Sequence, residues 1–329
     1  MNSAIHPKEN PNSDLAYQKA ILGSVSRTFA LTIPLLPPAI EVVVGNTYLL
    51  CRIVDTIEDA AELNPAEKQN LSKLFLEATL GTIPVASFVS PCLDALRGYP
   101  NVDELDLIAN TPTVLRILHT FSDRDRTAIS RCVSIMSDGM SHFHNRQSQE
   151  GLKDFAEFEK YCYVVAGVVG ELLTSIFSNY SPEFAKRIQG HEYLAIAFGQ
   201  ALQMTNILKD SPADRARGVS WKPAQMSQIE LLKIAYEKLH ESMSYISLLP
   251  ENEIGMRRFC FLAFGLAVMT LEKITSRKEF SNQFEVKLSR NSVWIFYAFT
   301  KIAAGNEFLM KSFFYIASKQ LRKLSAKNT

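Results

Sequence analysis

The sequence predicts an all-α protein, and three observations lead to that prediction. Apolar residues recur at three- and four-residue intervals along most of the chain, which is the period of a helix buried on one face. Sustained strand-like alternation is scarce, and no Asn-Gly or Asp-Gly hairpin joins two alternating runs. Breakers rich in Pro and Gly separate the helical runs, and none is long enough to be a linker. We therefore expect a single all-helical domain over residues 14–329 behind a disordered N-terminal tail, residues 1–13.

The helical period is clearest in seven runs. In chain order they are 42–59, 123–147, 153–178, 185–209, 225–248, 251–273 and 291–323. Within them, Tyr161–Phe177, Tyr193–Leu208 and Phe259–Leu271 are apolar nearly all round. A helix with that pattern lies at the centre of a bundle, so these three segments are the expected core.

Composition excludes several classes of protein. Thirty-five Lys and Arg residues against thirty-four Asp and Glu leave a net charge of +1, without the basic surplus that a nucleic-acid-binding protein usually carries. The five cysteines are scattered and never form a Cys-x-x-Cys pair, which argues against a disulfide scaffold or zinc cluster and favours a reducing compartment. The stretch Phe259–Leu271 is shorter than the roughly 20 residues of a membrane span. Residues 1–13 lack the apolar core of a signal peptide, so we expect a cytoplasmic protein.

The first chemical candidate is an acidic turn. Asp55 and Asp59 are four residues apart and therefore share one helix face, with Glu58 beside them. Like charges at this spacing destabilise a helix by a few tenths of a kcal/mol, roughly, unless water or a cation offsets them. A solvated acidic face and a Mg²⁺ site shared with phosphate oxygens both explain the pattern. Arg52 lies one turn earlier.

The second candidate lies at the end of a very apolar helix. Gln203, Asn206 and Asp210 form a polar stripe there, followed by Asp214. Buried amides and carboxylates need partners, so a satisfied core network is one reading. The other is a cleft in which both acidic pairs face each other and hold diphosphate through bridging Mg²⁺, with Arg52 and Lys209 adding positive charge.

Four segments in order resemble the motifs of the squalene/phytoene synthase family, and the resemblance extends from about Tyr17 to about Asn291. The segments are Ser26–Ala30, Tyr48–Asp59, Tyr161–Glu171 and Gln203–Asp214. The Asp-Thr-Ile-Glu-Asp form of the first aspartate-rich motif, together with a basic segment at Val286–Arg290, is closer to squalene synthases than to phytoene synthases. The resemblance implies an isoprenoid-synthase-like helical bundle around a central apolar cavity.

The resemblance also implies roles for individual residues. The catalytic set is Tyr161, Arg52, Asp55, Asp59, Asp210 and Asp214. The metal ligands are Asp55, Glu58, Asp59, Asp210 and Asp214. The substrate-binding set is Ser26, Arg27, Thr28, Phe29, Tyr48, Gln203, Asn206 and Lys209. The cofactor-binding set is Lys287, Arg290 and Arg217.

Two departures from the family pattern affect the second motif. Pro212 and Ala213 precede Asp214, and a proline inside a helix removes a hydrogen bond and clashes with the preceding turn. We therefore expect the helix to end or bend near Asp210. The family often has an arginine after a glycine, whereas Val219 follows Gly218, so Arg215 and Arg217 are the candidates to replace it.

The implied activity is the Mg²⁺-dependent head-to-head condensation of two farnesyl diphosphates to presqualene diphosphate, followed by reduction with NADPH to squalene. A phytoene, dehydrosqualene or hydroxysqualene synthase of the same fold is the main alternative. A non-catalytic helical assembly protein is a further alternative, against which the four retained aspartates argue. The resemblance allows a peripheral membrane contact for product release, and the sequence sets no oligomeric state.

Overall fold

The computed structural model describes residues 11–26, 28–144, 148–277 and 280–326, and within these ranges it contains helices and one isolated bridge, Leu152 to Pro223. The N-terminal half consists of α1 (Pro11–Val25), α2 (Phe29–Thr32), η1 (Ile33–Leu35), α3 (Pro38–Asp59), α4 (Pro65–Thr79), α5 (Ala86–Ala95), α6 (Val102–Ala109), α7 (Thr111–Leu118) and α8 (Asp123–His144). The predicted all-α class is confirmed. The expected tail lies largely outside the described residues, and its predicted end is wrong by three residues because α1 begins at Pro11.

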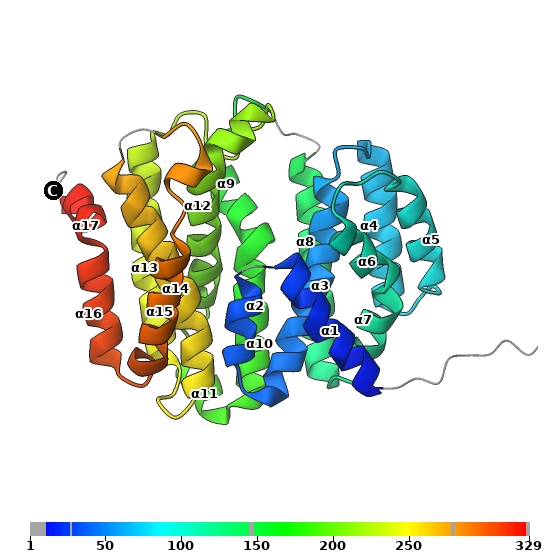
Figure 1. Ribbon diagram of the computed structural model, residues 1–329, viewed down its shortest axis with the longest axis horizontal. Helices are drawn as coiled ribbons and strands as arrows, with labels where there is room; N and C mark the ends of the chain where they lie inside the picture. The colour runs from blue at the N-terminus through cyan, green and yellow to red at the C-terminus, as the bar shows by residue number, and fades with distance from the viewer. Residues whose placement is uncertain (1–10, 27, 145–147, 278–279, 327–329) are drawn as a thin grey trace, which may run out of the picture.

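The second half contains the long central helices. It consists of α9 (Phe155–Cys162), the π-helical turn η2 (Tyr163–Gly167), α10 (Val168–Tyr180), α11 (Pro182–Arg187), α12 (Tyr193–Ala216), α13 (Gln228–Leu248), α14 (Ile254–Ser276), η3 (Gln283–Glu285), α15 (Arg290–Ala303), α16 (Glu307–Ala317) and α17 (Lys319–Ala326). Figure 1 shows α3–α8 on one side of α10 and α12–α17 on the other. Because α10 packs against α3, α8 and α12, it joins the two sides.

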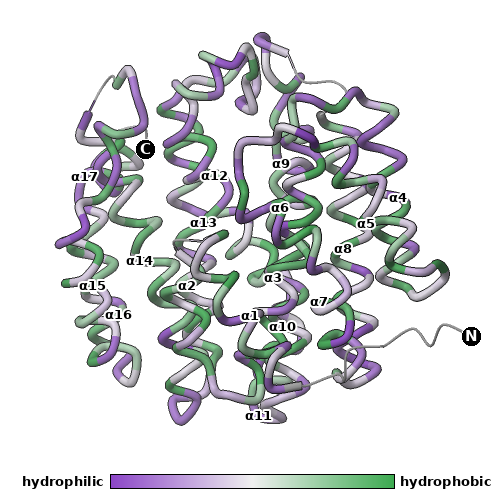
Figure 2. The backbone as a smooth tube through the Cα atoms, turned by 45° about the vertical axis from the view of Figure 1, so that its right-hand side comes forward, coloured by the Kyte–Doolittle hydropathy of each residue, from purple (hydrophilic) through white to green (hydrophobic). Residues whose placement is uncertain are grey.

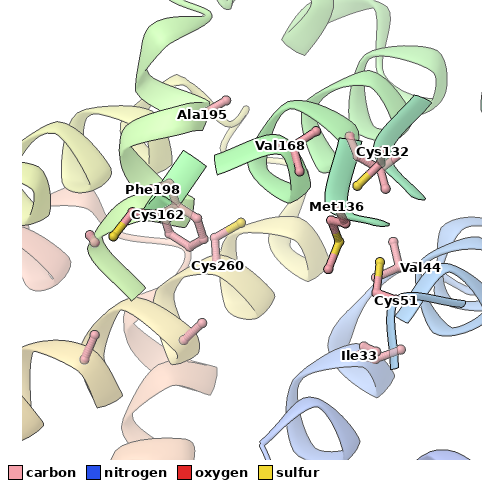
Figure 3. Packing of buried hydrophobic residues seen from close by; sticks show 14 of the residues in the cluster. Ile33, Val44, Cys51, Cys132, Met136, Cys162, Val168, Ala195, Phe198 and Cys260 are labelled. Atoms are coloured by element: carbon pink, nitrogen blue, oxygen red, sulfur yellow. The ribbon is translucent and has the colours of Figure 1, made fainter. Parts of the chain in front are cut away.

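The three segments expected at the centre do form the core. Helices α10, α12 and α14 bury most of their apolar side chains. Figure 3 shows two groups of buried side chains, one around Phe198 of α12 and Cys260 of α14, the other around Cys51 of α3 and Met136 of α8. All five cysteines are buried and carry free thiols in this structure. Figure 2 shows the complementary pattern, in which hydrophilic residues occupy many of the turns at the ends of the helices.

Two glycines let α12 approach its neighbours closely. A Cβ atom on Gly170 of α10 would lie 1.9 Å from the carbonyl oxygen of Ala195, and one on Gly199 of α12 would lie 2.0 Å from that of Ala166. No side chain fits at such distances, so any larger residue would push these helices apart. The close contact sets α12 beside η2, next to the predicted site.

Two of the predicted helical runs are broken. The run 185–209 is interrupted at Gly190, whose φ of 78° is a left-handed conformation that ends a helix. The run 291–323 is three helices rather than one, because Asn306 caps the start of α16 and Ser318 ends it. Periodicity alone does not reveal these breaks, since the apolar spacing continues across them.

Two helical stretches of the described chain are long and apolar enough to cross a membrane, Phe155–Tyr180 and Ile254–Ser276. The sequence argument that Phe259–Leu271 is too short for a span therefore fails on length, because the helix extends beyond that segment on both sides. Burial gives another reason to treat both as core helices. In their most apolar windows, 56% and 72% of the residues lie inside the bundle.

Candidate active site

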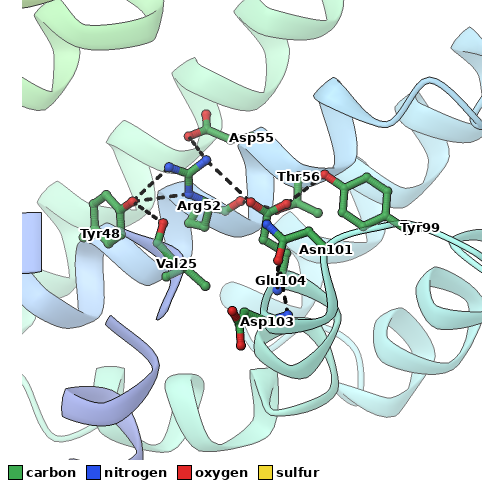
Figure 4. A network of polar contacts seen from close by, with 9 residues as sticks. All are labelled: Val25, Tyr48, Arg52, Asp55, Thr56, Tyr99, Asn101, Asp103 and Glu104. Carbon is green, nitrogen blue, oxygen red and sulfur yellow. Dashed lines mark hydrogen bonds and ion pairs between the residues drawn. The ribbon is translucent and has the colours of Figure 1, made fainter. Parts of the chain in front are cut away.

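The first acidic motif occupies the last turns of α3, where Arg52 is held from two sides. Its Nη2 donates to the Tyr48 hydroxyl at 2.9 Å, and that hydroxyl donates to the Val25 carbonyl oxygen at 3.2 Å. Its Nη1 lies 3.9 Å from the Asp55 carboxylate (Figure 4). These contacts join the end of α1 to the acidic turn and fix the orientation of the guanidinium.

A buried carboxylate that sequence reasoning missed completes this network. Glu104 of α6 lies 3.9 Å from Arg52, and its Oε2 accepts hydrogen bonds from Tyr99 at 2.7 Å and Thr56 at 3.2 Å. Asn101 caps α6 by accepting from the backbone N–H of Glu104 (Figure 4). In the sequence Glu104 reads as an ordinary first-turn acid, so no local signal marks it.

Asp55 carries a strongly perturbed carboxyl group. Burial raises its pKa to about 7, and the charges of Asp59 and Glu104 add to this rise while Arg52 opposes it. A carboxylate in that environment is stabilised by any further cation that reaches it. Asp59, on the same helix face, is exposed.

Glu58 does not join the other acids, which corrects the expectation that it ligates metal. Its side chain is 1% exposed and accepts a hydrogen bond from Ser72 of α4 at 3.1 Å. Lys68 of α4 donates to its backbone carbonyl oxygen. A step of three residues turns a helix by about 300°, whereas a step of four returns it to nearly the same face. Glu58 therefore faces α4, and Asp55 and Asp59 share another face.

We expect Glu58→Ala to lower stability and spare the metal requirement. The change removes a buried partner of Ser72, which costs about 1–3 kcal/mol of unfolding free energy. Thermal unfolding checks the first part, and titration of activity with Mg²⁺ checks the second. An unchanged melting temperature together with a large rise in the Mg²⁺ needed would restore Glu58 to the ligand set.

The second acidic motif lies on the last three turns of α12, which continues through Pro212 to Ala216. The expected end near Asp210 is therefore wrong, and the alternative of a bend there stays a prediction. Asp214 is 6% exposed, and its Oδ1 accepts from Arg217 at 2.6 Å. The helix continues despite the local preference of proline, and Asp214 stays on the helix that carries Asp210.

Asp210 has one paired oxygen and one without a partner. Its Oδ2 lies 3.2 Å from Lys209 Nζ, which also donates to Asn206 Oδ1 at 3.2 Å. Its Oδ1 is buried and accepts no hydrogen bond from the residues that the structure describes. A buried carboxylate oxygen without a donor is costly, so it suits a site that a cation completes. Gln203 is half-buried one to two turns earlier on the same helix.

The two acidic motifs lie within electrostatic reach of each other. Burial raises the pKa of Asp214, and the charges of Asp210 and Asp59 raise it further against the effect of Arg217. Since Asp59 belongs to α3 and Asp214 to α12, the ends of these two helices bring charges of both motifs near each other. The cleft in which both acidic pairs face each other stays a prediction. Within the described ranges, no three Asp, Glu, His or Cys side chains gather closely enough to enclose one metal ion by themselves.

Tyr161 lies between the motifs. Burial raises the pKa of its hydroxyl well above its usual range, and the charges of Asp59, Asp214 and Asp55 raise it further. Its ring stacks on Trp221 with centroids 4.4 Å apart and an interplanar angle of 3°. Phe143 contacts it edge-on at 5.2 Å. The π-helical turn that follows is a distortion often found at functional sites.

Trp221 and Lys222 are further residues that sequence reasoning missed. With Asp214 and Arg215 they line a small pocket between the end of α12 and the loop that follows it. Burial and the charge of Arg215 lower the pKa of Lys222. The only signal in the sequence is their position just after the second motif. A larger groove of about 920 Å³ lies elsewhere, between α13, α16 and α17, and contains none of the motif acids.

Part of the predicted substrate-binding segment Ser26–Ala30 contacts the first acidic motif. Phe29 contacts Tyr48 with ring centroids 4.9 Å apart, and Ser26 accepts from the Phe29 backbone N–H at 3.0 Å. Thr28 is exposed. The prediction for Arg27 lies outside the described residues.

The predicted cofactor residues are not brought together by any contact that the structure describes. Arg217 is paired with Asp214. Lys287 Nζ lies 5.7 Å from the Phe284 ring centroid, and Arg290 is exposed at the start of α15. The η3 segment lies in the chain between α14 and Lys287, and it packs against α12. It therefore brings Lys287 to the α12 side of the bundle.

Comparisons with known proteins place this geometry in context. The family model described as squalene/phytoene synthase matches residues 22–231. A Botryococcus squalene synthase from Botryococcus braunii is 31% identical over 197 residues, which cover 60% of this chain and 39% of that protein. The chain spans less than half the length of the first four curated squalene synthases that it matches.

Solved structures extend the likeness to the whole fold. The structure of TcSQS with the ligand BPH1237 superposes with a TM-score of 0.73 at 20% identity, and covers 94% of this chain and 99% of that one. A dehydrosqualene synthase in complex with a ligand gives a TM-score of 0.61 at 19% identity, with 94% and 98% covered.

Proposed function

The chain belongs to the squalene/phytoene synthase family, and from this premise we propose that it is a squalene synthase, a farnesyl-diphosphate farnesyltransferase. It joins two farnesyl diphosphates head to head with loss of one diphosphate and one proton, giving presqualene diphosphate. Loss of the second diphosphate and hydride transfer from NADPH then give squalene. The observation that supports this proposal is that a buried tyrosine, Tyr161, is affected by charges of both acidic motifs, those of Asp55 and Asp59 on α3 and of Asp214 on α12.

The acidic residues fit a magnesium site. The buried Oδ1 of Asp210, which has no hydrogen-bond partner among the described residues, and the raised pKa of Asp55 both favour a bound cation. We propose Asp55, Asp59, Asp210 and Asp214 as the residues that hold Mg²⁺, which when bound acts as a Lewis acid on the diphosphate leaving group. Arg52 and Lys209 add fixed positive charge, and Arg52 is oriented in advance by Tyr48 and Glu104.

Tyr161 serves the reaction through its ring and its hydroxyl. Because its pKa is raised, the hydroxyl stays protonated at neutral pH, and its oxygen can accept a proton only transiently. The stacked Trp221 and the edge of Phe143 exclude water from one side, which an allylic cation requires. We assign Tyr161 Oη to the proton lost in the condensation. The apolar cavity for the farnesyl chains stays a prediction.

A synthase that stops before reduction is the second candidate, and one observation favours it. Arg217 is engaged by Asp214, and Val219 stands where the family often has an arginine. The remaining predicted NADPH contacts are Lys287 and Arg290, both exposed. Phytoene, dehydrosqualene and hydroxysqualene are the products that such an enzyme makes.

We expect squalene carrying one deuterium when the protein is incubated with farnesyl diphosphate, Mg²⁺ and NADPH deuterated at the transferred position. The hydride is the only hydrogen that the cofactor gives to the product, so mass spectrometry shows a gain of a single deuterium. A parallel reaction with geranylgeranyl diphosphate tests chain length. An unlabelled C30 or C40 hydrocarbon, or a C30 alcohol formed equally fast without NADPH, would assign the chain to the second candidate.

A further inference from the structure

We propose that the outer face of α15 and α16 binds the surface of an anionic lipid bilayer. This surface, called the α15–α16 face below, consists of Trp294, Ile295, Ile302, Phe308, Tyr315 and Ile316. The two helices lie beside each other at one side of the molecule (Figures 1 and 2). The proposal rests on this surface and not on the proposed reaction.

The α15–α16 face concentrates exposed apolar side chains. Its six residues are between 55% and 76% exposed. The described chain has thirteen large apolar residues that are exposed, and six of them fall within positions 294–316. Single exposed apolar residues are ordinary, whereas a contiguous group marks a contact surface.

The helical spacing shows that the exposed apolar residues of each helix lie on one side of it and are not scattered around it. On α15, Trp294, Ile295, Ala298 and Ile302 follow the spacing of one helix side, and all four are exposed. A surface helix normally presents its polar side to water, and here the outward side is apolar. On α16, Phe308, Tyr315 and Ile316 repeat the pattern.

The opposite sides of both helices are already packed. Phe296 of α15 and Phe313 of α16 stack with ring centroids 4.6 Å apart, and Phe261 of α14 lies 5.6 Å from Phe313. Phe264 of α14 contacts Phe314 at 5.1 Å. The exposed residues are therefore additional to a complete core and are not displaced members of it.

The charge around this face selects the partner. Residues 286–326 contain seven Lys and Arg and one Glu, a net charge of +6 in a chain whose total is +1, which leaves −5 for the rest. Lys301 Nζ lies 4.6 Å above the Tyr297 ring, and the Arg322 guanidinium lies 3.5 Å above the Tyr315 ring. Basic residues interleaved with aromatic ones are the pattern that enters the headgroup region of an anionic membrane.

A second copy of the chain fits this face less well. A two-fold dimer brings the same surface patch of both subunits together, so it would place two such basic regions opposite each other. Like charges at an interface oppose association. An anionic bilayer offers both an apolar interior for the six side chains and phosphate groups for the cations.

The test is sedimentation of the full chain with phosphatidylcholine vesicles, with and without phosphatidylserine, in the absence of substrate. We expect binding to the vesicles that contain phosphatidylserine, weakened by salt. The triple variant Ile295→Ser, Ile302→Ser and Phe308→Ser should bind at least about tenfold more weakly, because the apolar contact is lost. The matched control Leu80→Ser, Val102→Ser and Ile229→Ser removes exposed apolar residues elsewhere and should bind as the wild type does.

Three outcomes would overturn the proposal. They are absence of binding to phosphatidylserine vesicles, equal binding by the two triple variants, and a concentration-dependent dimer that the first triple variant dissociates. Circular dichroism and thermal unfolding of both variants establish that they fold. Because no substrate is present, absence of vesicle binding would not contradict the proposed reaction. Absence of synthase activity would likewise not contradict membrane binding by the α15–α16 face.

Discussion

Asp55→Asn and Asp210→Asn are each expected to reduce turnover by about 10³-fold or more, the loss typical of removing preorganised charge from a reacting centre. Each substitution keeps the shape of the side chain and removes its negative charge. Asp55 has a pKa of about 7, and Asp210 has a buried oxygen that accepts no hydrogen bond from the described residues, so both carboxylates are suited to a bound cation. Steady-state kinetics with farnesyl diphosphate, and Mg²⁺ titration of the residual activity, provide the measurement.

Although Asp55→Asn is expected to lower turnover, it is expected to raise the stability of the cation-free protein. A group whose folded-state pKa is raised, here from 3.8 to about 7, contributes stability that is complete below pH 3.8 and is lost as the pH rises through 7. Above pH 7, Asp55→Asn should therefore stabilise the cation-free protein by about 0.5–2 kcal/mol. The difference from wild type should shrink below pH 7, where Asp55 is already protonated.

A surface substitution provides the control for this pair. Asp94→Asn removes an exposed carboxylate that pairs with Arg97 at the end of α5. It should change neither turnover nor Mg²⁺ requirement. Full activity of Asp55→Asn, or wild-type turnover in excess chelator, would contradict the assignment of the acidic cleft.

The sequence predicts those parts of the site that depend on spacing along one helix. Asp55 and Asp59 share a face, and Gln203, Asn206 and Asp210 form one polar stripe, because a repeat of 3.6 residues determines both relations. Which neighbour each face meets is a tertiary property. Glu58 shows the difference, because its burial against α4 depends on where Ser72 lies, and Ser72 is fourteen residues away.

Residues recruited from other elements could not be found from the sequence. Glu104 reaches Arg52 across 52 positions, and Trp221 reaches Tyr161 across 60, with no periodic pattern to relate them. Pro212 illustrates the reverse case, in which a strong local signal is overridden. Pro212 lies in the last turns of α12, which continues to Ala216 despite the lost hydrogen bond and so carries Asp214.

Tyr161→Phe is expected to lower kcat by about 10²–10⁴-fold with little change in KM, the range of a group that transfers a proton in the transition state. The change removes one oxygen and leaves the ring stacked on Trp221 at 4.4 Å, so packing and substrate binding should persist. Single-turnover kinetics separate the condensation from product release, and thermal unfolding checks the fold.

The adjacent tyrosine supplies a matched control for this loss. Tyr163 is two residues away, and its hydroxyl donates to Glu171 at 2.9 Å and accepts from Arg131 at 3.4 Å. Both partners lie on the α8–α10 side, away from the acidic residues whose charges act on Tyr161. Tyr163→Phe should therefore lower the free energy of unfolding by roughly the cost of one hydrogen bond. Its kcat should stay within a few-fold of the wild-type value. Equal kcat values for Tyr161→Phe and the wild type would reduce Tyr161 to a packing residue. A loss shared equally by both variants would indicate that disturbance of η2, rather than the hydroxyl between the acidic motifs, slows the reaction.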